Sequence, residues 1–162
     1  MIRGFHHTSF TVSDLDVAER FFVELFGLQR LAGGQFQADS LRRIVGFADA
    51  ELRISYLAFP RTGAGRPTHV LELIQYLSPA GEPTDTSTNR PGNAHLCFEV
   101  TDVHAQHARL SDRGVRFTSA PQPVTWGANQ GAWTAYCRGP DGIALELLQP
   151  PDNATEHPSP TT

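Results

Sequence analysis

The sequence of 162 residues contains no lysine, so all 13 of its basic residues are arginine. The absence of lysine excludes Schiff-base chemistry and a lysine base, and it excludes a phosphate-binding loop of the type that needs a lysine. The two cysteines, Cys97 and Cys137, form no C-x-x-C pair, and in a cytoplasmic protein we expect both to be reduced.

The chain also lacks any long hydrophobic run. No apolar segment approaches the roughly 20 residues of a membrane helix, and the N-terminus shows no signal-peptide pattern. The formal net charge is -4, with no block of basic residues, which argues against nucleic-acid binding. We therefore expect a cytoplasmic protein with no membrane or nucleic-acid partner. Its length is sufficient for one domain with a substantial core.

A repeated stretch is the most informative feature that is present. The segments His7–Leu15 and His95–Val103 both fit the pattern H-x-x-F-x-V-[S/T]-D-[L/V]. A second repeat pairs Leu71–Gln75, which reads LELIQ, with Leu145–Gln149, which reads LELLQ. Each half of the chain therefore begins with a strand that carries a histidine and ends with a strand that carries a glutamate.

The first half has the pattern β-α-β-(short α)-β-β. Alternation and residue type predict strands over residues 5–12, 29–37, 51–59 and 68–77. One helix is expected to begin after an N-cap at Asp14 and to end at Gly27. A shorter helix is expected over residues 40–45, capped by Asp39. Gly33 and Gly34 are expected to interrupt the second strand, and residues 60–67 to form a turn.

The second half repeats this plan without the short helix. Strands are expected over residues 94–100, 115–118, 133–138 and 143–149, and a helix between Asp102 and Gly114. Residues 121–131 are expected to form a loop, and Gly139–Gly142 a hairpin turn. We thus predict an α+β fold in one domain over residues 1–150, with modules at 3–77 and 93–150. Residues 78–92 are predicted to be a linker, and residues 151–162 a disordered tail.

The repeated ends of the two halves suggest a metal site. We predict that His7, Glu72, His95 and Glu146 bind one divalent ion, because two imidazoles and two carboxylates suit Ni, Co, Mn, Zn or Fe. Each glutamate lies in an apolar strand, where an unpaired carboxylate is costly to bury. The alternative is that these are ordinary half-exposed strands whose polar residues face solvent. That interpretation is weaker, because the histidine motif and the glutamate motif both recur in the two halves.

These motifs resemble the vicinal-oxygen-chelate superfamily, which includes glyoxalases, bleomycin-resistance proteins and extradiol dioxygenases. The resemblance covers residues 3–150 and rests on FHHTSFTVSDLD, HVLELIQYL, NAHLCFEVTDV and GPDGIALELLQP. It implies two tandem βαβββ modules that form a half-open, barrel-like mixed sheet around a metal, usually in a homodimer. The ligand set is most similar to that of bacterial glyoxalase I, and the resemblance implies Glu146 or Glu72 as the catalytic base.

The predicted function is a metal-dependent lyase or isomerase, glyoxalase I-like or epimerase-like, acting by proton transfer on a small carbonyl substrate. A methylmalonyl-CoA epimerase is disfavoured, because Ile54 stands where such enzymes carry a catalytic glutamate. An extradiol iron dioxygenase ranks second. Four protein ligands would leave two of the six coordination positions of the metal, and a bidentate substrate would fill both, so that no position is left for oxygen. A metal-free antibiotic-binding protein is the third possibility.

Several other polar or aromatic residues have an ordinary structural explanation. His6, His104 and His107 are expected to be structural or exposed, and Cys97 to be a small buried thiol near His95. Tyr56 and Tyr136 are expected in the core or in an apolar pocket wall.

Overall fold

The protein is described by a computed structural model that covers residues 1–2, 4–60 and 69–151. The chain divides into two compact units, Met1–Thr84 and Asp85–Thr162, and each is described by itself. The expected turn over residues 60–67 and the expected tail over residues 151–162 lie almost wholly outside the described residues.

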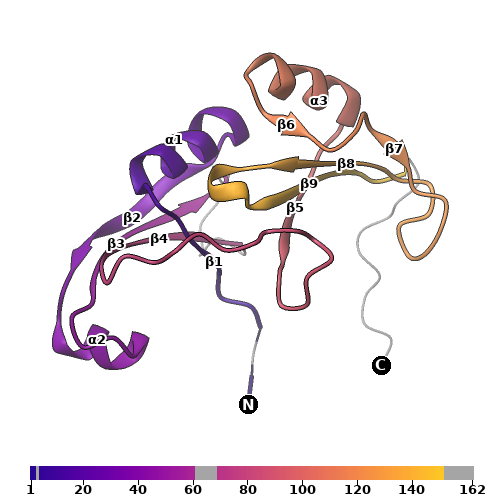
Figure 1. The fold of residues 1–162 in the computed structure, drawn as a ribbon. Coiled ribbons are helices and arrows are strands. Elements are labelled where there is room, and N and C mark those ends of the chain that lie inside the picture. The colour runs from indigo at the N-terminus through magenta and orange to yellow at the C-terminus, as the bar shows by residue number, and fades with distance from the viewer. Residues whose placement is uncertain (3, 61–68, 152–162) are drawn as a thin grey trace. The chain divides into compact units, whose positions relative to one another are not determined.

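Unit 1 is a four-stranded mixed sheet with a long helix on it (Figure 1). The strand order is β1-β4-β3-β2; β1 is parallel to β4, and the other neighbours are antiparallel. The elements are β1 (Thr8–Thr11), α1 (Leu15–Phe26), β2 (Gln29–Phe36), α2 (Asp39–Val45), β3 (Glu51–Ala58) and β4 (Leu71–Ser78).

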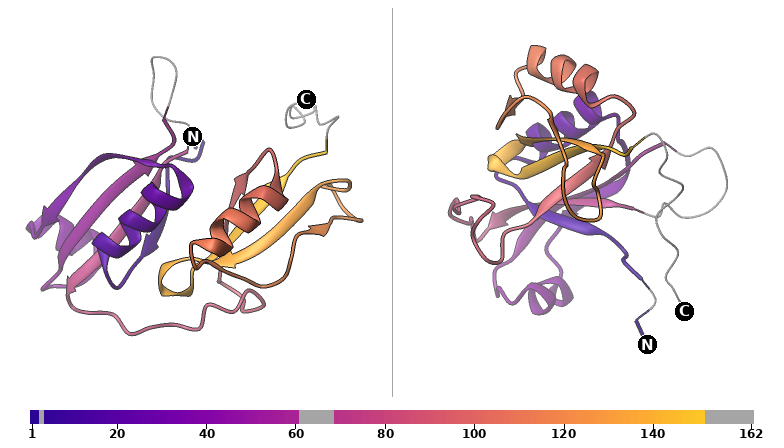
Figure 2. Two further views of the ribbon diagram at one scale, coloured as in Figure 1. Left: turned by 90° about the horizontal axis from the view of Figure 1, so that it is seen from above. Right: turned by 90° about the vertical axis from the view of Figure 1, so that its right-hand side faces the viewer.

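Unit 2 repeats the same topology (Figure 2). Its strands β6 and β8, with two and six residues, are shorter than the corresponding strands β2 and β3 of unit 1, with eight residues each. The strand order is β5-β9-β8-β6, with β5 parallel to β9 and the short β7 also paired with β8. The elements are β5 (His95–Glu99), α3 (Val103–Asp112), β6 (Arg116–Phe117), β7 (Gln122–Pro123), β8 (Trp133–Arg138), a 3-10 turn (Pro140–Gly142) and β9 (Ala144–Gln149). The α+β prediction with two βαβββ modules is confirmed, and each module forms a sheet of its own.

Both long helices begin as the sequence predicts. The Asp14 carboxylate accepts hydrogen bonds from the backbone N–H groups of Asp16 and Val17, and Asp102 accepts one from Ala105. These bonds satisfy N–H groups that have no partner inside the helix. Gly27 ends α1 in the left-handed conformation, with φ of 75°.

The glutamine of each repeated strand also contacts a helix start. The Gln75 side chain accepts a hydrogen bond from Leu15 N–H at 3.4 Å, and that of Gln149 accepts one from Val103 N–H at 3.0 Å. The last residue of the LELIQ and LELLQ motifs therefore fixes the helix that follows the first strand of its module.

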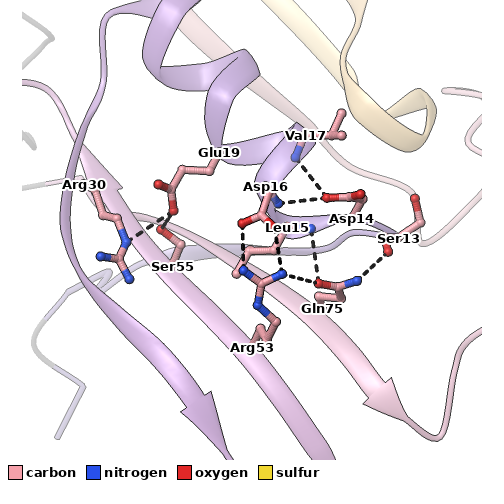
Figure 3. A network of polar contacts seen from close by, with 10 residues as sticks. All are labelled: Ser13, Asp14, Leu15, Asp16, Val17, Glu19, Arg30, Arg53, Ser55 and Gln75. Atoms are coloured by element: carbon pink, nitrogen blue, oxygen red, sulfur yellow. Dashed lines mark hydrogen bonds and ion pairs between the residues drawn. The ribbon is translucent and has the colours of Figure 1, made fainter.

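A polar network fastens α1 of unit 1 to its sheet (Figure 3). Arg53 of β3 binds Asp16 at 2.7 Å, and the Ser55 hydroxyl donates to Glu19 at 2.6 Å. Glu19 also pairs with Arg30 of β2 at 3.3 Å. The apolar side of α1 is buried through Ala18 and Phe22, so the helix is held by both kinds of contact.

Three sequence-based expectations about local structure were wrong. Strand β2 runs without a break through Gly33, which pairs with Ser55. A Cβ at Gly33 would lie 2.3 Å from the Ile54 carbonyl oxygen, so glycine lets the two strands approach there. Helix α2 has Ala38 at its N-cap, with Asp39 already in the first turn. The predicted loop over residues 121–131 contains strand β7. The hairpin expected at Gly139–Gly142 is confirmed, since Pro140–Gly142 forms a 3-10 turn between the antiparallel strands β8 and β9.

None of the helices in the described part of the chain is long and apolar enough to cross a membrane.

Candidate metal centre

In unit 1, the predicted ligands His7 and Glu72 lie side by side. His7 Nε2 is 3.3 Å from Glu72 Oε2. His7 directly precedes β1, and the parallel pairing of Ser9 with Glu72 puts the histidine two residues away on the same face. The Glu72 side chain is 9% exposed and that of His7 is 37% exposed, so the pair has a buried carboxylate and an accessible imidazole.

In unit 2, His95 and Glu146 form an equivalent pair. His95 Nε2 is 3.0 Å from Glu146 Oε2, and the two side chains are 43% and 12% exposed. The parallel pairing of Cys97 with Glu146 again puts the histidine two residues away on the same face. The repeat seen in the sequence therefore produces the same local geometry in both units.

A tyrosine accompanies each pair, which the sequence analysis missed. Tyr56 is directly opposite Glu72 on antiparallel strands, and Tyr136 is directly opposite Glu146. Tyr56 donates a hydrogen bond to Glu72, and Tyr136 donates to Glu146 Oε2 at 3.0 Å. Both tyrosines thus act as hydrogen-bond donors to glutamate, rather than as purely apolar wall residues.

The glutamates keep these tyrosines protonated. The hydrogen bond to Glu72, followed by burial, raises the pKa of Tyr56 to about 12. Burial, followed by the hydrogen bond to Glu146, raises the pKa of Tyr136 to about 12. At neutral pH both hydroxyls are therefore neutral donors, since ionising either would place a second negative charge beside a carboxylate.

Glu146 has two further neighbours. The Thr134 hydroxyl lies 2.6 Å from Glu146 Oε1 and 3.0 Å from the Leu147 carbonyl oxygen. Cys97 is exposed rather than a buried core thiol, which corrects the expectation, and it hydrogen-bonds Glu146. Desolvation, with the charge of Glu146, raises the pKa of the Cys97 thiol to about 12, so the thiol is not an activated nucleophile.

The observed distances suit ligands that share one ion. Two donors about 2.1 Å from a metal are about 3.0 Å apart at an octahedral edge and about 3.4 Å apart at a tetrahedral one. The histidine-to-glutamate separations of 3.0 and 3.3 Å fall in this interval. Hydrogen-bonded imidazole and carboxylate groups have similar separations, so the distances are compatible with a metal without requiring one.

The two pairs belong to different units. Across residues 1–2, 4–60 and 69–151, no group of three or more His, Cys, Asp or Glu side chains is close enough to hold an ion. The structure thus brings together His7 with Glu72 and His95 with Glu146, and the four-residue set remains a prediction. Three other histidines contact aromatic rings: His104 packs edge-on against Trp133, His107 contacts Phe117, and His6 contacts His7.

Comparison with known proteins identifies related sequences along nearly the whole chain. A 2-epi-5-epi-valiolone epimerase from Actinomyces sp. is 33% identical over 156 residues, covering 92% of this chain and 80% of that protein. A probable lactoylglutathione lyase from Synechocystis sp. is 23% identical over 143 residues, covering 88% and 92%. The chain spans less than half the length, 44 to 47%, of related yeast and plant glyoxalases.

The fold comparison agrees with the sequence comparison. A glyoxalase family protein from Bacillus cereus superposes with a TM-score of 0.78 at 22% identity, covering 93% of this chain and 96% of that one. The model of the Glyoxalase/Bleomycin resistance protein/Dioxygenase superfamily matches residues 4–147. The chain, with its paired βαβββ modules and a histidine, a glutamate and a tyrosine together in each, belongs to the glyoxalase/bleomycin resistance/dioxygenase superfamily.

Proposed function

We propose that this protein is a divalent-metal-dependent isomerase or lyase that transfers a proton on a small carbonyl substrate. The observation that carries the proposal recurs in both units: a glutamate whose side chain is only 9% or 12% exposed and an accessible histidine lie 3.3 or 3.0 Å apart. The relatives, an epimerase and glyoxalase-type lyases, support the enzyme class.

The protein ligands of the proposed ion are His7 and Glu72 from unit 1 with His95 and Glu146 from unit 2. A divalent ion held by them would act as a Lewis acid on two neighbouring substrate oxygens. The exposed imidazoles and the less exposed carboxylates suit this role, because the histidine side of each pair is accessible to a substrate. Ni, Co, Mn, Zn and Fe all accept this ligand set.

Within this scheme, a glutamate is the proton carrier. Glu72 or Glu146 takes the proton from the carbon next to the carbonyl and returns it to the product. The chain contains no lysine, and Tyr56 and Tyr136 hold their protons at neutral pH, so neither type of residue competes as the base. The tyrosine hydroxyls keep donating to the carboxylates.

An epimerisation of a ketone is the first reaction to test. The relative with 33% identity is named for epimerising 2-epi-5-epi-valiolone, and that name denotes a ketone. The glutathione hemithioacetal used by glyoxalase I is the second candidate substrate, since glyoxalases are also among the relatives. Both reactions would use the same proton transfer by a glutamate. They would differ in the substrate, which is a ketone for the epimerase and a glutathione hemithioacetal for glyoxalase I.

A homodimer is the proposed assembly. In that assembly the four ligands come either from one chain or as one pair from each of two chains. Mixing Glu72→Ala chains with Glu146→Ala chains distinguishes these arrangements, because partial recovery of activity requires a site shared by two chains. A protein that is monomeric by light scattering while active would contradict the dimer.

The deciding experiment for the reaction is turnover in deuterated water without oxygen. The purified chain, loaded with one divalent ion, is incubated with each candidate substrate, and deuterium in the product is measured by mass spectrometry. Deuterium incorporation without oxygen is the expected result. Turnover that depends strictly on oxygen and bound iron would instead establish dioxygenase chemistry, and metal-free binding of an antibiotic would establish a sequestering protein.

A further inference from the structure

The Glu146 carboxylate is held at both of its oxygens. Thr134 donates to Oε1 at 2.6 Å, and Tyr136 donates to Oε2 at 3.0 Å. A hydroxyl has a single proton, and the shorter contact of Thr134 directs it to the carboxylate rather than to the Leu147 carbonyl at 3.0 Å. With a donor at each oxygen, the carboxylate plane has one preferred orientation.

Glu72 of unit 1 lacks the first of these donors. The antiparallel pairing of Tyr56 with Glu72 corresponds to that of Tyr136 with Glu146, so Ile54 and Thr134 both lie two residues before the tyrosine. Both are half-buried, on the same face as the tyrosine. Ile54 has no hydroxyl, so it cannot do for Glu72 what Thr134 does for Glu146.

We propose that Thr134, together with Tyr136, is a positioning residue that fixes Glu146 as the oriented carboxylate of the metal centre. Glu72, with an isoleucine at the matching position, is then the carboxylate with more freedom to change its hydrogen-bond partners. This inference rests on the proposed function, since the orientation matters through metal binding. Hydrogen-bond partners of metal ligands commonly set the metal affinity in this way.

The test compares four variants of the full chain in two measurements, and two further glutamate variants serve only to assign resonances. Thr134→Val removes the hydroxyl with little change of volume, and Thr134→Ser keeps it. Ile54→Thr introduces a hydroxyl at the matching position of unit 1. Thr125→Val, in the exposed loop between β7 and β8, is the matched control for loss of a threonine hydroxyl.

The first measurement needs no metal. The chain is labelled with ¹³C at the glutamate carboxyls, and the resonances of Glu146 and Glu72 are assigned with the Glu146→Gln and Glu72→Gln variants. Thr134→Val should move the Glu146 resonance, whereas Thr134→Ser and Thr125→Val should leave it in place. Ile54→Thr should move only the Glu72 resonance. An unmoved Glu146 resonance in Thr134→Val would overturn the proposal.

The second measurement is the affinity for Co²⁺. Binding is monitored by calorimetry and by the visible absorption of the bound ion. Thr134→Val should bind Co²⁺ about 10-fold more weakly, with recovery in Thr134→Ser. If wild type binds Co²⁺ and Thr134→Val binds it equally well, the positioning role is overturned while the proposed function stands. If wild type binds no Co²⁺, the proposed function fails, and the carboxyl resonances still decide whether Thr134 orients Glu146.

Discussion

The two units use the same topology but fasten their helices in different ways. In unit 1, Asp16 of α1 forms an ion pair with Arg53 of β3 at 2.7 Å. Counted from the N-cap aspartates, the residue of α3 that matches Asp16 is His104, and its partner is Trp133, with ring centroids 4.8 Å apart. A charged contact in one unit is thus replaced by an aromatic contact at the same position in the other.

The residues of the candidate site differ far less between the units. Each unit has a histidine at or directly before the start of its first strand, and a glutamate that faces a tyrosine across an antiparallel pair. The glutamine that contacts the helix start is also present twice. The comparison teaches that helix docking tolerates different chemistry, whereas the histidine, glutamate and tyrosine are the same at equivalent positions.

The largest expected effect tests whether the two pairs are equivalent. His7→Ala and His95→Ala should each lower the affinity for a divalent ion by about 100-fold or more, because each removes one protein ligand and leaves the carboxylates poorly compensated. Metal content and affinity are measured by atomic absorption and calorimetry. His107→Ala, whose ring contacts Phe117, is the control. Loss of metal in only one of the two variants would show that the units are not equivalent.

The next effect concerns strand β2 of unit 1, which has eight residues, whereas the corresponding strand β6 of unit 2 has two. Gly33→Ala should lower the free energy of unfolding by roughly 2 to 3 kcal/mol, through strain and overpacking. The added Cβ would lie 2.3 Å from the Ile54 carbonyl oxygen, at a φ of 153°. Chemical denaturation measures the change. Gly46→Ala, at a helix end where a Cβ meets no atom within 4 Å, separates the close approach from the loss of a positive-φ glycine.

The aromatic contact of unit 2 should give a smaller effect that salt does not alter. Trp133→Ala should lower the free energy of unfolding by about 1 kcal/mol, since it removes the ring pair with His104. Denaturation is measured in low and in high salt. A loss that disappeared in high salt would mean that the contact of His104 is ionic rather than aromatic.

The smallest effect is the pH dependence of the stability that the Asp16–Arg53 ion pair gives to unit 1. The hydrogen bond from Arg53 is the main reason that the pKa of Asp16 is lowered from 3.8. A lowered pKa favours the folded state above pH 3.8, and this contribution is lost as the pH falls through the folded-state value. Asp16→Asn should therefore be less stable than wild type at pH 7 and equal to it in strong acid. An unchanged difference at low pH would contradict the ion pair.

Much of the architecture could be predicted from the sequence because it depends on local signals. Asp14 and Asp102 begin helices through their own side chains, and Gly27 ends one. The repeats also singled out the histidine and the glutamate that lie together in each unit, while the four-ligand site predicted from them stays a prediction. The superfamily followed from the same repeats.

The tyrosines and Thr134 could not be found in this way, because their role depends on strand register. The sequence predicted the strands 133–138 and 143–149 without a register, and the structure pairs Arg138 with Ala144. A shift of one residue in a hairpin moves every side chain to the other face. In the observed register Tyr136 lies opposite Glu146, whereas a shift by one residue would put it opposite Leu145.

Short motifs and residue alternation encode the module plan, the N-caps of the two long helices and the histidine and glutamate of each module, so these could be inferred without the structure. Only the tertiary structure decided which donors hold each carboxylate and what fastens each helix. Those contacts join strands and helices that are distant in the chain, and the hydrogen-bonded register of the sheets, rather than any local pattern, selects their partners.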